Sequence, residues 1–68
     1  MKINKEKFEI LLAENCMTIS ELAKIIKTDN SIISKINKGF DKFRPATVGK
    51  IAKALNVPVV ELIENNNN

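Results

Sequence analysis

The sequence predicts an all-α fold, a compact domain of five helices in which the second and third form a helix-turn-helix. Two runs carry apolar residues at positions i, i+3, i+4 and i+7, the spacing of one face of an α-helix. In the stretch 18–39, capping signals mark two short helices joined by a tight turn. We expect one domain over residues 1–64 and a disordered asparagine tail over 65–68.

The first expected helix follows Asn4, whose side chain can cap it, and runs for about ten residues. Its apolar face is formed by Phe8, Leu11 and Leu12. Asn15 is expected to adopt the left-handed conformation that ends many helices. Cys16 is expected to fill space between helices as a small apolar side chain.

The second expected helix begins at Thr18 with the pattern T-x-x-E, in which Thr18 and Glu21 can each accept a hydrogen bond from the other's backbone amide. Its apolar face, which must be buried, contains Ile19, Leu22, Ala23 and Ile26. Lys27 follows in the turn, where a positive φ would cost a lysine about 1 kcal/mol relative to glycine. That strain is small enough for the motif to form.

The third expected helix starts after Asp29, which is placed to cap it, and ends at Gly39. Its inner side carries Ile33 and Ile36. Its outer side combines short polar side chains with long cations: Asn30, Ser31, Ser34, Lys35 and Lys38. These residue types suit the base edges and phosphates of DNA, although the same set could form an ordinary solvated surface. The capped pair of helices around them favours the functional interpretation.

The loop after the third helix is expected to pack Phe40 and Phe43 on the core while Lys42 and Arg44 point outward. Positive charge is concentrated in this part of the chain. Residues 24–53 hold eight Lys and Arg against two Asp, a local charge of +6, whereas the rest of the chain carries −3. Electrostatic binding to phosphates requires such a concentration, although a charge run of this kind can also be a solvated face.

Pro45 fits the first position of a fourth helix, where its missing amide costs nothing. The apolar face of this helix contains Val48, Ile51, Ala52 and Leu55. Gly49 is expected to permit close contact with another helix, because its only local effect is to weaken the helix. Asn56 can end the helix in the left-handed conformation, and Pro58 can begin a short fifth helix that runs through Ile63.

Composition excludes several kinds of site. One cysteine and no histidine exclude an intrachain disulfide, a Cys/His zinc cluster and a Ser-His or Cys-His nucleophilic pair. No apolar run approaches the roughly 18 residues of a membrane helix. Glutamates such as Glu9 and Glu14 are expected to be solvated, and the chain is too short to enclose a substrate cleft. We therefore expect a cytoplasmic protein that is not an enzyme, with no cofactor, metal, membrane partner or small-molecule substrate.

The stretch 18–39, TISELAKIIKTDNSIISKINKG, resembles the helix-turn-helix of the lambda-repressor-like family, the Cro and phage-repressor type also called XRE-type. ELAKII matches the family's first motif helix, SIISKINKG its recognition helix, and PATVGKIAKALNVPVVELI its two closing helices. The resemblance covers nearly the whole chain. Relatives usually have Gly at Lys27, and Gln at Ile19, where the glutamine often holds a phosphate or steadies the recognition helix. That phosphate contact does not carry over to an isoleucine.

The resemblance implies a sequence-specific regulator of transcription that binds double-stranded DNA. It further implies a repressor of the phage or mobile-element type that binds a two-fold operator as a homodimer. The expected base contacts are Asn30, Ser31, Ser34 and Lys35. The expected phosphate contacts are Lys27, Lys38, Lys42 and Arg44. In relatives the segment that matches 57–61 supplies the dimer contact, and here it either does so or closes the core, through Val57, Pro58, Val59, Val60 and Glu61.

A second function also fits the sequence. The chain could be a small helical adaptor or antitoxin-like module that binds a protein partner through Ile32 and the Val59/Val60 surface, with weak or secondary DNA binding. Ile32 is expected on the flank of the third helix, between core and outer face, where it could also touch a thymine methyl group. A module of this kind would show little salt dependence and would form a stoichiometric protein complex.

Overall fold

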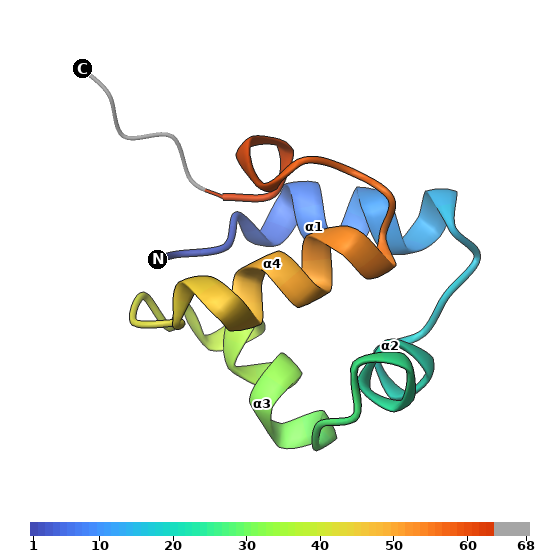
Figure 1. The fold of residues 1–68 in the computed structure, drawn as a ribbon, viewed down its shortest axis with the longest axis horizontal. Helices are drawn as coiled ribbons and strands as arrows, with labels where there is room; N and C mark the ends of the chain where they lie inside the picture. The colour runs from blue at the N-terminus through green and yellow to red at the C-terminus, as the bar shows by residue number, and fades with distance from the viewer. Residues whose placement is uncertain (64–68) are drawn as a thin grey trace.

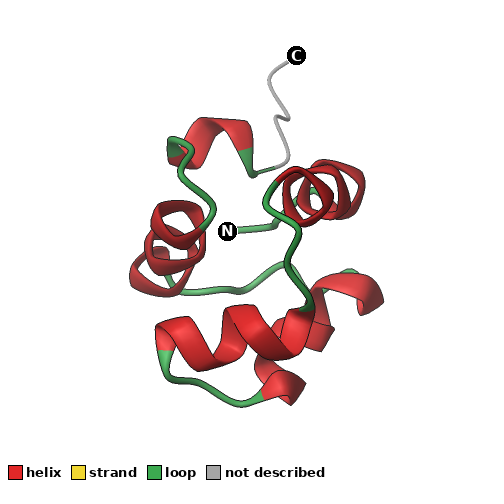
Figure 2. Ribbon diagram, turned by 90° about the vertical axis from the view of Figure 1, so that its right-hand side faces the viewer, coloured by secondary structure: helices red, strands yellow, loops and turns green. Residues whose placement is uncertain are grey.

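The computed structural model describes residues 1–63, and over these residues the chain is all-helical. Its helices are α1 (Lys5–Glu14), α2 (Ile19–Ile26), α3 (Asn30–Ser34) and α4 (Pro45–Ala54), with the 3-10 turns η1 (Lys35–Lys38) and η2 (Val59–Glu61). In Figure 1, α2 and α3 lie together below α1 and α4. Figure 2 shows that loops alone connect the helices of the described part, without a strand. The predicted asparagine tail and residue 64 lie outside the described residues.

The predicted number of five α-helices is not confirmed. Where the fifth was expected, Pro58 is followed by a single 3-10 turn, Val59–Glu61. The chain then extends, because Ile63 forms an isolated antiparallel bridge with Ile3. The Leu62 carbonyl accepts a hydrogen bond from the Asn4 amide at 2.9 Å. Pairing with the N-terminal segment therefore replaces further helix.

The core forms where the inner faces of the helices meet. All four apolar positions predicted for α4 are buried, and on α2 Leu22 and Ala23 are buried while Ile19 and Ile26 are half-buried. Ile3 is also buried, although no helical pattern pointed to it. The buried residues are Ile3, Phe8, Leu11, Leu22, Ala23, Ile33, Ile36, Phe43, Val48, Ile51, Ala52, Leu55 and Leu62. Aliphatic packing with two phenylalanines thus stabilises this small domain.

Most of the predicted helix starts are confirmed. The Asn4 side chain accepts a hydrogen bond from the Lys7 amide at 2.9 Å. Thr18 and Glu21 form both halves of the capping box, at 3.1 and 2.8 Å. Pro45 is the first residue of α4. The prediction for Asp29 is wrong in one respect: its backbone is extended as at an N-cap, but its side chain makes no capping hydrogen bond.

The helices end in the same way, with a left-handed residue whose successor donates its amide five residues back. The left-handed residues are Cys16 (φ 52°), Lys27 (φ 60°), Gly39 (φ 77°) and Asn56 (φ 62°). The amides that close these ends belong to Met17, Thr28, Phe40 and Val57. This is the Schellman arrangement, and it satisfies carbonyls that a helix end leaves without partners. The predictions for Lys27, Gly39 and Asn56 are confirmed.

The end of α1 differs from the prediction. Cys16, and not Asn15, has the positive φ, and its side chain is exposed, so it does not fill space between helices. The Asn15 side chain amide instead donates to the carbonyls of Leu11 at 2.8 Å and Leu55 at 3.3 Å. Asn15 therefore ties the end of α1 to the end of α4.

Gly49 of α4 makes no close helix contact, so that prediction is wrong: an added Cβ would meet no heavy atom within 4 Å. We expect Gly49→Ala to raise the free energy of unfolding by about 0.5–1 kcal/mol, because alanine favours a helix interior. Gly39→Ala is the matched comparison, since a Cβ there is equally free of contacts but φ is +77°. It should lower the free energy of unfolding by about 1 kcal/mol. Urea denaturation measures both, and shifts of the same sign would contradict the assignment.

Candidate nucleic-acid interface

The predicted recognition helix is α3, continued by η1, and two buried residues set its orientation. Ile33 and Ile36 are almost completely buried, at 0% and 2% exposed, and they fix which side of the helix faces inward. Gly39 ends the element. Of the predicted base contacts, three are exposed and Ser34 is half-buried. The outer face of α3 therefore presents short polar side chains and a cation to an approaching surface.

Asn30, the first residue of α3, is held by a side chain of α2. Its Nδ2 donates a hydrogen bond to Ser20 Oγ at 2.8 Å, across ten residues of sequence. Within residues 1–63 this is the one hydrogen bond that the Asn30 side chain makes. Oδ1 and the second N–H of Asn30 are left for the bidentate contact that asparagine makes with adenine. Ser20 thus orients the amide.

The sequence pattern did not point to Ser20, which the structure places in a hydrogen bond with a predicted base contact. Ser20 follows Ile19, the position where the resemblance implies a glutamine that steadies the recognition helix. In this chain the neighbouring hydroxyl makes the link between α2 and α3. The sequence feature that could have indicated Ser20 is its place inside the capping box, on the side of α2 away from the apolar face formed by Leu22 and Ala23.

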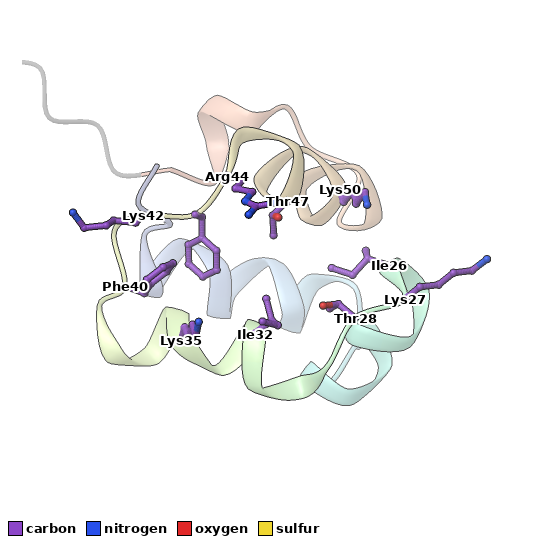
Figure 3. Close-up of a pocket in the computed structure, with 11 residues that line it drawn as sticks. Ile26, Lys27, Thr28, Ile32, Lys35, Phe40, Lys42, Arg44, Thr47 and Lys50 are labelled. Atoms are coloured by element: carbon purple, nitrogen blue, oxygen red, sulfur yellow. The ribbon is translucent and has the colours of Figure 1, made fainter.

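Positive side chains gather between α3 and α4, around a hollow of about 410 Å³ that we call the basic groove (Figure 3). Its cations are Lys27, Lys35, Lys42, Arg44 and Lys50. No ion pair joins any of the five to another residue of the described chain, so their charges are not neutralised locally. Four were predicted as DNA contacts, and the structure brings these four together. Lys50 was not predicted.

Two phenylalanines anchor the loop that carries Lys42 and Arg44, as predicted. Phe43 is 5% exposed, and Phe40 is half-buried against it, with ring centroids 4.8 Å apart and planes at 88°. Lys35 Nζ lies 4.9 Å from the centroid of the Phe40 ring, a cation–π contact. The loop and the recognition helix are therefore linked through Phe40.

The remaining predicted residues lie elsewhere. Lys38 is exposed in η1. Val57, Pro58 and Val59 line a separate hollow against α4, Val60 is 68% exposed, and Glu61 is exposed. Ile32 lines the basic groove. Of the residues proposed to bind a protein partner, Ile32 and Val59 therefore line different hollows, and Val60 lines neither of them.

Residues 7–67 match the family model of the Cro/C1-type HTH DNA-binding domain. The chain belongs to this family. It therefore carries an XRE-type, Cro-like helix-turn-helix, and it is a DNA-binding regulator of transcription. The Cro/C1-type family is typically non-enzymatic. No curated protein and no solved structure matches the chain.

None of the helices in residues 1–63 has the length and apolar character needed to cross a membrane. Within residues 1–63, no group of three or more His, Cys, Asp or Glu could hold a metal ion.

Proposed function

We propose that the protein is a sequence-specific repressor of the phage or mobile-element type, which binds a two-fold operator in double-stranded DNA as a homodimer. The observation that carries this proposal is the outer face of α3, where Ser20 holds the amide of Asn30 on a helix whose inner face is almost completely buried. An oriented amide on a rigid element suits direct reading of a base edge, because hydrogen bonds to bases require fixed geometry.

We assign the contacts by position and chemistry. Base contacts come from the outer face of the recognition helix, through Asn30, Ser31, Ser34 and Lys35. Lys35 would favour guanine O6 and N7, and Asn30 would pair with adenine N6 and N7. Phosphate contacts come from cations around that helix: Lys27, Lys38, Lys42 and Arg44. Phosphate contacts fix the position of the protein, and base contacts provide the specificity.

The proposed two-fold interface is the segment 57–61, in which Val60 is exposed enough to meet a second copy. Homodimerisation would place two recognition helices in successive major grooves, about 34 Å apart on one side of the duplex. Sedimentation of the protein, free and on DNA, tests this interface. A strictly monomeric profile in both states would exclude it.

The operator can be tested by selection from a pool of randomised duplex DNA at near-physiological salt, followed by sequencing of the retained fraction. We expect an inverted repeat whose half-sites lie about 10 base pairs apart. Recovery of a single half-site would support direct reading of bases but not dimeric binding. A retained pool without any common motif would refute the base contacts assigned to α3.

Ser20→Ala is expected to relax the preference for adenine at the Asn30 position by about 3- to 10-fold, the value of one ordinary hydrogen bond. Affinity for random DNA should stay unchanged, because Ser20 acts through Asn30 and not on the phosphates. Ser20→Thr keeps the hydroxyl and is the matched control. Competition binding against operators altered at single positions measures the effect. If Ser20→Ala weakens all sequences alike, Ser20 does not orient Asn30.

A further inference from the structure

The basic groove opens on one flank of α3 and not on its outer face. Ile32 of α3 and Lys35 of η1 form one wall, and Arg44, Thr47 and Lys50 form the opposite wall at the start of α4 (Figure 3). None of Asn30, Ser31 and Ser34 lines the groove. The groove is therefore a surface separate from the base-reading face, although it shares Lys35 with that face.

The floor of the groove is apolar. Ile26, Ile32 and Phe40 are half-buried there, and Phe43 lies beneath them at 5% exposed. A DNA backbone has phosphates to offer the cations, but its sugars carry no projecting aliphatic or aromatic side chain that would fill this floor. An aliphatic or aromatic side chain would remove the floor from water, which is favourable in proportion to the apolar area covered.

The cations are spread over the whole length of the groove. Figure 3 shows Lys27 and Lys42 at opposite ends, with Lys35 on one wall and Lys50 on the other. A single small anion would contact one end of such an arrangement and leave the other cations without partners. An extended chain with several negative charges would contact both ends.

We propose that the basic groove binds an acidic segment of a partner protein, with one apolar side chain seated on Ile32 and Phe40 and carboxylates paired with the surrounding cations. Five cations that have no ion-pair partner within residues 1–63, together with an apolar floor, match such a segment in both charge and chemistry. The segment would occupy Lys35, Lys42 and Arg44, which we assign to DNA. The segment and DNA would then exclude each other. This exclusion rests on the proposed function, whereas binding of the segment does not.

The test uses a synthetic peptide in which one phenylalanine is flanked on each side by aspartates, added to the full chain without DNA. NMR titration should shift the amide signals of Ile32, Phe40 and Thr47. Lys50→Glu should weaken the peptide by about tenfold or more, because it places a like charge on the α4 wall. Lys53→Glu is the matched control, because it makes the same change in net charge. Lys53 is exposed on the same helix and does not line the groove. This control variant should change the affinity by less than about threefold.

Two comparison ligands test whether the groove prefers an acidic segment with an apolar side chain. A peptide with serine in place of phenylalanine should bind about tenfold more weakly, because it leaves the floor exposed to water. A short single-stranded oligonucleotide should bind more weakly than the phenylalanine peptide and should shift Ile32 and Phe40 less. Equal losses for Lys50→Glu and Lys53→Glu, equal binding of the two peptides, or tighter binding of the oligonucleotide would each overturn the proposal.

A final measurement separates this proposal from the proposed function. The phenylalanine peptide should displace the protein from its selected operator, and Lys50→Glu should need about tenfold more peptide for the same displacement. If the protein bound no specific DNA, the NMR titration would still decide whether the groove takes an acidic segment. If it bound both ligands at once, the mutual exclusion would be wrong and the groove would not share Lys35 with DNA.

Discussion

Replacing Phe43 by alanine is expected to unfold most of the protein at 25 °C. Phe43 is 5% exposed, and truncation of a buried phenylalanine costs about 3–5 kcal/mol. A domain of 68 residues has a free energy of unfolding on the order of 5 kcal/mol, so the loss from this one substitution is comparable with the total free energy of unfolding. Urea denaturation followed by circular dichroism measures the change.

The backbone around Phe43 adds to this expectation. Its amide donates to the Met1 carbonyl at 3.1 Å, and its carbonyl accepts from the Met1 amine at 2.8 Å. The ring therefore lies where the N-terminal segment meets the loop before α4. Loss of the ring would free both, together with Lys42 and Arg44 on that loop.

Phe40→Ala is the matched control, because it removes the same ring from a half-buried position in the same loop. It should cost about 1–2 kcal/mol, since less apolar surface is lost, and the protein should stay folded. It also removes the cation–π partner of Lys35 without removing the core contact of Phe43. Equal stability of the two variants would show that Phe43 does not anchor the loop.

The parts of the fold that depend on neighbours in sequence could be predicted. The capping box of α2, Pro45 at the start of α4 and the apolar face of α4 each follow from residues within one or two helical turns. The same local reasoning placed Phe40 and Phe43 correctly. Local reasoning failed for Asp29, whose side chain makes no capping hydrogen bond, and at the end of α1, where Cys16 has the positive φ predicted for Asn15. In both places, several short side chains close together can satisfy the same helix end.

Contacts between distant parts of the chain could not be predicted. The bridge between Ile3 and Ile63 joins the two ends of the described chain. Neither end has a helical period, and no hairpin turn connects the two segments directly. This pairing is also why the fifth helix is reduced to a single 3-10 turn. A bridge that pairs one residue with one residue is too short to produce the alternation of apolar and polar residues by which a β-strand is recognised in a sequence.

The candidate site was predictable in its charges and not in its geometry. The concentration of cations in residues 24–53 pointed to Lys27, Lys35, Lys42 and Arg44. That these four surround one groove together with Lys50 depends on how α3 and α4 both pack against α2. The role of Ser20 depends in the same way on how α2 meets α3. Both require the tertiary structure.

Lys35→Ala is expected to weaken operator binding by about 1–3 kcal/mol, with the loss concentrated at one base pair. Lys35 is exposed on the outer side of the recognition helix, and its contact with Phe40, at 4.9 Å, restricts its position before DNA arrives. Less conformational entropy is then lost on binding, which favours a base contact over a diffuse charge effect. Lys35→Arg should retain the preference at that base pair, because arginine also pairs with guanine O6 and N7.

Lys42→Ala is the contrasting variant, because Lys42 is exposed in the loop, at the end of the basic groove opposite Lys27 (Figure 3). It should weaken operator and random DNA alike, and the slope of log K against log salt concentration should become shallower by about one unit. Fluorescence anisotropy at several salt concentrations, on the operator and on single-base variants, measures both quantities. A uniform loss on every sequence for both lysines would refute the assignment of Lys35 to a base. A loss at one base pair for Lys42→Ala would place the loop in the major groove, and the contact scheme around α3 would have to be reversed.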